Sequence, residues 1–193
     1  MIDIITEGQM AAFHRVLDPL DNSTGGGTAS AVAGAMAAAL VAMVARLSVG
    51  ANAVEGEAFY QGIAREAGGL REALLAGAEE DARSFDAVMA AFRLPKATDA
   101  EKQTRRAAIQ EATVYATRVP LHNAEHCAEV LALAAQLEGR SNPRALSDLQ
   151  SAGYLARAGL QGCLANVDIN LPGVKDEAEA GEIRGRATAL NAA

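Results

Sequence analysis

The chain has 193 residues, of which 50% are hydrophobic and only 4% aromatic, and its formal net charge is −7. This length predicts a single domain over residues 1–193. The composition predicts a core of small aliphatic side chains, which favours close-packed helices over a sheet. The negative charge argues against a nucleic-acid partner, because the sequence has no basic stripe that would neutralise phosphates.

The two cysteines and the N-terminal residues indicate the cellular compartment of the protein. Cys127 and Cys163 lie in helical patterns and lack the paired spacing of a disulfide framework, so both are expected to be buried thiols. The opening Met1-Ile2-Asp3 has no basic region of the kind that begins a signal peptide. We therefore expect a cytoplasmic location.

Prolines, glycines and capping residues divide the chain into helices with short joints. Thr98-Asp99-Ala100-Glu101 is a capping box, Pro120 is expected to separate two helices, and Asn142 is expected to cap the last long one. Residues 167–171 are expected to be at most a short extended piece. The pattern predicts an all-α, single-domain bundle of about six to seven helices. Their expected ranges are 6–17, 29–45, 57–92, 98–118, 121–137, 142–166 and 178–193.

The segment 29–45 carries no charge, and its length approaches that of a membrane span. Alanine and glycine dominate it, so we interpret it as a buried core helix and expect no membrane partner. Ser30, Gly34 and Ala38 recur at helical spacing and form a seam of small side chains. This seam, together with the small residues around Ala156 and Gly159, predicts a homodimer.

Gly25, Gly26 and Gly27 directly precede this helix. Three glycines allow several backbone N–H groups to be exposed at once, and a helix N-terminus favours a negatively charged or carbonyl-rich ligand. The motif matches neither a P-loop nor a dinucleotide fingerprint. The alternative is that the glycines only permit a tight turn.

Acidic and amide side chains near the last long helix are candidates for chemistry. Asp148 follows Ser147 in the first turns of this helix, where it is either a reactive carboxylate or an acid that complements the helix dipole. Asn166 and Asn170 lie at the helix exit, where they either cap the helix or present amides to a ligand. On a straight helix Asp148 and Asn166 would stand about 27 Å apart, so they would contact opposite ends of a long ligand or meet across an oligomer.

Three further features have both a functional and an ordinary interpretation. Asp81 ends the acidic run 79–81, which could equally be a solvated surface. Lys96 follows a proline in a loop, where it either binds an anion or is simply exposed. His122 and His126 have a spacing that binds zinc when a third ligand is present, but no glutamate follows the first histidine, and we expect no metal.

Three ordered blocks of sequence resemble the cyclodeaminase/cyclohydrolase family of folate one-carbon enzymes, from about Gly25 to Asp176. The family opens on Pro-Thr-Pro-Gly-Gly-Gly-Ser before an alanine-rich helix, and this chain has Asn22-Ser23-Thr24-Gly25-Gly26-Gly27-Thr28. The second block comprises Ser84-Phe85-Asp86, Leu94-Pro95-Lys96-Ala97-Thr98, Glu101-Lys102, Arg105 or Arg106, Gln110-Glu111-Ala112 and Val119-Pro120-Leu121. The third comprises Gly139-Arg140-Ser141-Asn142, Ser147-Asp148 and Asn166-Val167-Asp168-Ile169-Asn170-Leu171.

The resemblance implies a tetrahydrofolate substrate and no cofactor. It implies a methenyltetrahydrofolate cyclohydrolase, with a formimidoyltetrahydrofolate cyclodeaminase as the alternative. In either reaction Asp148 or Asp81 would serve as the acid or base, and Asn166 with Asn170 would orient the pterin ring. Lys96 would pair with the glutamate of the folate or with a developing negative charge, and the ligand would also contact Gly25, Gly26, Gly27 and Ser147.

The chain also departs from the family. Members usually carry two or three basic residues and an aromatic residue after the glycine that follows the alanine-rich helix, whereas Gly50 is followed here by Ala51-Asn52-Ala53-Val54. A divergent, non-catalytic helical binding or assembly protein is therefore a third interpretation.

Overall fold

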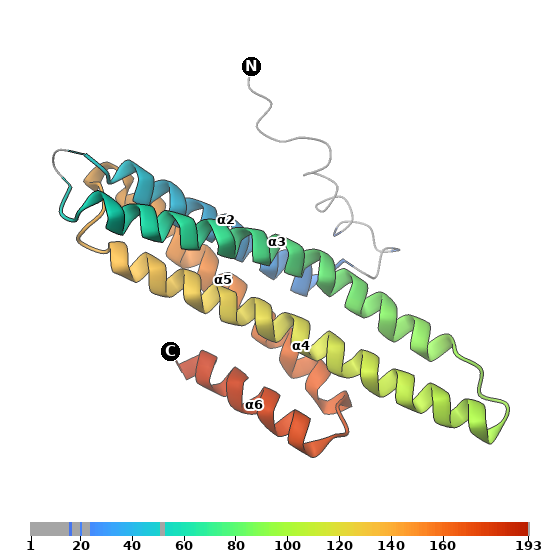
Figure 1. The fold of residues 1–193 in the computed structure, drawn as a ribbon. Coiled ribbons are helices and arrows are strands. Elements are labelled where there is room, and N and C mark those ends of the chain that lie inside the picture. The colour runs from blue at the N-terminus through green and yellow to red at the C-terminus, as the bar shows by residue number, and fades with distance from the viewer. Residues whose placement is uncertain (1–15, 17–19, 21–23, 51–52, 193) are drawn as a thin grey trace.

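The computed structural model describes residues 16, 20, 24–50 and 53–192, and every regular element among them is helical (Figure 1). The predicted all-α class is confirmed, whereas the predicted helix 6–17 falls almost entirely outside the described residues. The long helices are α2 (Gly26–Leu47), α3 (Glu57–Arg93), α4 (Asp99–Leu137) and α5 (Leu146–Asn170), followed by the shorter α6 (Glu177–Ala192).

Helix α2 is the central element and packs against α3, α4 and α5. Close approach depends on its small residues: a Cβ added to Gly159 of α5 would lie 2.8 Å from the carbonyl oxygen of Ser30. Ala38 of the predicted seam is fully buried, as is Ala156 on α5. The small faces that predicted a dimer are therefore covered within one chain, and they no longer argue for a second copy.

The length and composition of α2 would also allow it to cross a membrane, although 56% of its apolar window is buried inside the protein. No other helix among the described residues meets that criterion. Its place between three helices agrees with the predicted core helix.

The break predicted at Pro120 is wrong, because α4 runs without interruption from Asp99 to Leu137 with Pro120 inside it. Proline has no N–H group, so the carbonyl of Ala116, four residues earlier, loses its helical partner. The side-chain amide of Asn170 donates to that carbonyl at 2.8 Å. A residue from the end of α5 thus replaces the missing hydrogen bond, and the helix continues.

Other helix ends follow local signals more closely. The predicted capping box is confirmed, with the N–H of Glu101 donating to Thr98 Oγ1 at 3.2 Å and the Glu101 carboxylate accepting from the Thr98 N–H at 2.8 Å. Asn142 caps a 3-10 turn, Pro143–Ala145, and α5 starts only at Leu146. Residues 167–171 are not extended: α5 continues to Asn170 and a second 3-10 turn follows.

The C-terminal helix α6 lies along α4, to which ion pairs attach it (Figure 1). Arg118 of α4 pairs with Glu179 and Glu182 of α6, and Arg186 of α6 pairs with Glu125 of α4. Because these partners are partly exposed, the pairs orient α6 more than they stabilise it.

The pairing of Asn170 with Pro120 can be tested by a double-mutant cycle. Asn170→Ala leaves the carbonyl of Ala116 without a partner, and we expect it to lower the free energy of unfolding by about 1–3 kcal/mol. Pro120→Ala restores the N–H group that Ala116 needs. In the Pro120→Ala background the cost of Asn170→Ala should therefore fall clearly in urea unfolding. Equal costs in both backgrounds would show that Asn170 does not serve this carbonyl.

Candidate functional site

The first turn of α2 meets the carboxylate of Asp81 on α3. Thr28 Oγ1 donates to Asp81 Oδ2 at 3.0 Å. A Cβ added to Gly27 would overlap this carboxylate, since its carbon atom Cγ would lie only 2.7 Å away. Glycine at position 27 thus lets an acidic side chain lie directly against the backbone at a helix N-terminus.

This position changes the acidity of Asp81. Burial raises the pKa of the carboxyl above its usual value, and hydrogen bonds from the side chain and backbone of Thr28 offset only part of that effect. A carboxyl group with a raised pKa, at a helix end whose first N–H groups have no partner within the helix, is a candidate for proton transfer. The interpretation of Asp81 as a purely solvated surface acid does not fit this half-buried environment.

Asn166 of α5 reaches the same end of α2. A Cβ added to Gly26 would be 3.6 Å from Asn166 Nδ2, and this amide donates to the carbonyl of Gly162 at 2.8 Å. Of the predicted site residues, the structure brings together Asp81, Asn166 and the three glycines 25–27. They come from three helices that are distant in sequence.

The remaining predicted residues lie elsewhere in the chain. Asn142, just before α5, bonds to Leu47 and Ser48 at the C-terminal end of α2, so Ser147 and Asp148 lie at the end of α2 opposite to Gly27. The other two residues also lie away from Asp81. Lys96 is exposed in the loop between α3 and α4, and the Asn170 side chain donates to the carbonyl of Ala116.

The two cysteines are free and buried, as predicted. A hydrogen bond between the two thiols and the burial of Cys163 raise the pKa of that thiol, and Asp81 adds to the effect through its charge. The Cys163 thiol is therefore an uncharged part of the core close to Asp81. In the part of the chain that the structure describes, no three His, Cys, Asp or Glu side chains are grouped as metal ligands would be.

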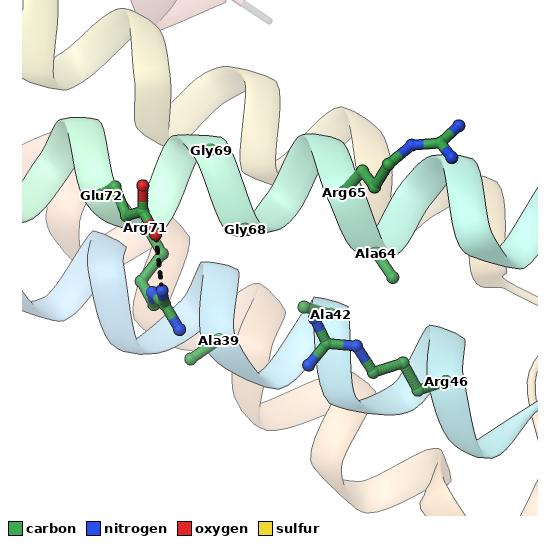
Figure 2. A pocket seen from close by; sticks show the side chains of 9 residues that line it. All are labelled: Ala39, Ala42, Arg46, Ala64, Arg65, Gly68, Gly69, Arg71 and Glu72. Atoms are coloured by element: carbon green, nitrogen blue, oxygen red, sulfur yellow. Dashed lines mark hydrogen bonds and ion pairs between the residues drawn. The ribbon is translucent and has the colours of Figure 1, made fainter.

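A groove of about 350 Å³ lies between the outer surfaces of α2 and α3 (Figure 2). Its floor is made of Ala39, Ala42, Ala64, Gly68 and Gly69, and its rim of Arg46, Arg65, Arg71 and Glu72. Sequence analysis did not identify this groove, because its arginines are spread over two helices. Only the pairing of α2 with α3 brings them together.

The comparisons with known proteins agree with this fold. Residues 9–189 match the model of the family described as formiminotransferase-cyclodeaminase. A methenyltetrahydrofolate cyclohydrolase from Methylorubrum extorquens is 44% identical over 170 residues, which cover 86% of this chain and 82% of that protein. The formimidoyltransferase-cyclodeaminase of Sus scrofa is 32% identical over 182 residues, which are 94% of this chain and 34% of that protein.

The solved structure of a formiminotetrahydrofolate cyclodeaminase from Thermotoga maritima has the same fold. The two structures superpose with a TM-score of 0.83 at 24% sequence identity. The superposition covers 100% of this chain and 91% of the Thermotoga chain. The chain thus spans nearly all of one solved relative but only about a third of the animal enzyme from Sus scrofa.

The burial of Asp81 predicts a stability that depends on pH. Because the pKa of Asp81 is raised in the folded protein, its ionised form costs stability above that pKa. Asp81→Asn keeps an oxygen that accepts from Thr28, and we expect it to raise the melting temperature at pH 7. The gain should shrink toward the ordinary aspartate pKa of about 3.9, below which the carboxyl is protonated in both states. Asp86→Asn, on an exposed part of the same helix, is the control, and a gain that does not vary with pH would contradict the account.

Proposed function

The chain belongs to the formiminotransferase-cyclodeaminase family, and we propose that it hydrolyses 5,10-methenyltetrahydrofolate to 10-formyltetrahydrofolate. The observation that carries this proposal is the 44% identity to a protein named methenyltetrahydrofolate cyclohydrolase, over 82% of that protein's length. The relatives named formimidoyltransferase-cyclodeaminase are more distant, and the match covers only about a third of each of them. Release of ammonia from 5-formiminotetrahydrofolate is the alternative reaction.

The proposed reaction needs positioned proton transfer and no redox step. The methenyl carbon joins N5 and N10 and is electrophilic, so a water molecule adds to it and gives a tetrahedral carbinolamine as one proton leaves. The carbon–N5 bond then breaks, N5 takes up the proton of the carbinolamine hydroxyl, and the formyl group stays on N10. The sum is one water consumed and one proton released.

Asp81 is suited to the proton transfers in this sequence. Its raised pKa brings the carboxyl closer to the range in which it can both accept a proton from water and return one to N5. The N–H groups at the start of α2 and the Asn166 amide lie beside it and supply donors for acceptor atoms of the pterin ring. The site therefore combines one acid/base group with groups that hold the ring.

Turnover can be followed as the loss of the near-ultraviolet absorbance of 5,10-methenyltetrahydrofolate above its spontaneous rate. We expect Gly27→Ala to lower kcat/KM by about a hundredfold or more, because the added methyl group displaces the Asp81 carboxylate. Gly181→Ala on α6, where an added Cβ meets no atom within 4 Å, is the matched control.

Three outcomes would contradict parts of this proposal. Equal activity of the two glycine variants would remove Asp81 from the site. Ammonia release from 5-formiminotetrahydrofolate without hydrolysis of the methenyl substrate would favour the cyclodeaminase. No turnover and no binding of either substrate would support a non-catalytic member of the family.

We also propose a homodimer in which Asp148 of one chain completes the Asp81 site of its partner. Within one chain Asp148 lies at the far end of α2, and a pair of antiparallel α5 helices would bring it beside Asn166 of the other chain. Tyr154, near the middle of α5, has 74% of its surface exposed and Ile169 has 78%, which supports a partner on this face.

Complementation tests this arrangement. Asp81→Asn and Asp148→Asn are each expected to lose most activity, whereas a mixture that has exchanged subunits should regain part of it, because one site per mixed dimer holds both aspartates. Light scattering should give twice the chain mass of 19.9 kDa. A monomer at micromolar concentration, or mixed dimers without activity, would contradict the shared site.

A further inference from the structure

We infer that the groove between α2 and α3, rimmed by Arg46 and Arg71, binds the glutamate carboxylates of the folate whose pterin ring lies at Asp81. This inference rests on the proposed function. It adds a second binding region that contains none of the residues predicted from the sequence.

The arginines of the groove leave positive charge available to a ligand. In Figure 2 the side chains of Arg46 and Arg71 lie along the opening between the two helices, while Arg65 points away from it. Arg71 pairs with Glu72 at 2.9 Å, and Arg46 has no ion pair with any residue that the structure describes. The rim thus carries three arginines against one acid in a chain whose net charge is −7.

The shape of the groove results from its floor. Every floor residue is alanine or glycine, so no side chain fills the space between the helices. An adjoining hollow of about 390 Å³ shares Arg46, Ala64 and Arg65 with it and continues the opening toward Val49 and Tyr60. A planar guanidinium binds a carboxylate through two parallel hydrogen bonds, so this open, cationic groove is suited to a ligand with carboxylate groups.

One face of α2 connects the groove to the Asp81 site. Thr28, which bonds to Asp81, and Arg46 are eighteen residues apart, or five turns, and so lie on the same line of the helix. The residues between them on this line are all apolar and none is larger than valine: Val32, Ala35, Ala39 and Ala42. Ala39 and Ala42 lie about 17 and 21 Å along the axis from Thr28.

This spacing matches the organisation of a folate, which carries its pterin at one end, an aminobenzoyl ring in the middle and glutamate at the other end. Val32 and Ala39 on this line are partly exposed and offer a small apolar surface to the middle ring, whereas Ala35 and Ala42 are buried in the core. Leu75, about one turn beyond Arg71 on α3, has 46% of its surface exposed and extends this apolar surface. A folate extended along α2 would therefore reach both Asp81 and the two arginines.

The inference can be tested with a substrate that lacks the glutamate, 5,10-methenyltetrahydropteroate. Arg46→Gln and Arg71→Gln should each raise KM for 5,10-methenyltetrahydrofolate by about threefold to thirtyfold and leave kcat unchanged, since only substrate binding is lost. Neither change should affect KM for the pteroate analogue. Added salt should raise KM for the glutamate-bearing substrate alone. Arg184→Gln, on the exposed surface of α6, is the matched control.

The outcomes separate this inference from the function on which it rests. Wild-type turnover with the same KM in both arginine variants would overturn the groove but keep the hydrolase. A selective rise in KM for Lys96→Gln instead would place the glutamate at the opposite end of α3 and also overturn it. If the wild type turns over neither substrate, calorimetric binding of tetrahydrofolate provides the readout, and equal affinity in wild type and variants, or no binding at all, would refute the inference.

Discussion

The contact between Asp81 and the first turn of α2 is the constraint on which the site depends. An acidic side chain can lie against a helix N-terminus because residue 27 has no Cβ and residue 28 has a hydroxyl group. The helix end and the Thr28 hydroxyl favour the charged carboxylate, while burial opposes it more strongly and raises the pKa. The same contact fixes α3 against α2, and with it the groove farther along the two helices.

A second long-range contact preserves the scaffold around that site. Pro120 lies in the middle of a helix of 39 residues, and Asn170 replaces the hydrogen bond that the proline cannot make. Asn170 and Asn166 lie four residues apart on α5 but have different roles. Asn170 completes the hydrogen bonding of α4, and Asn166 lies beside Gly26 at the start of α2. The last turns of α5 thus carry both an asparagine that stabilises the bundle and an asparagine that lies at the site.

The features that were predictable from the sequence depend on local chemistry. The helical class follows from small apolar residues and few aromatics, the start of α4 from its capping box, and the end of α3 from Pro95. The break expected at Pro120 was wrong because the compensating amide comes from a residue 54 positions beyond Ala116 in the sequence. Such a partner can be found only once α4 and α5 are packed together.

The same distinction applies to the site. The glycines were identifiable from their position before an uncharged helix. Sequence reasoning favoured Asp148 over Asp81, although the suitability of each carboxylate depends on which helix end it meets, and that is decided by the packing of the helices. Periodicity correctly placed Asp148 and Asn166 on one face of α5, and the structure leaves them at opposite ends of α2. The arginine groove carried no local signal at all, since Arg46 and Arg71 become neighbours only through helix packing.

The measurement that tests the central claim most directly is the titration of the Asp81 carboxyl by carbon NMR in protein labelled at aspartate, with Asp81→Asn to assign the resonance. The account predicts a pKa above the ordinary value of about 3.9 in the free protein, and a further change when 10-formyltetrahydrofolate is added. An ordinary pKa that does not respond to the folate would contradict the placement of Asp81 at the reacting atoms.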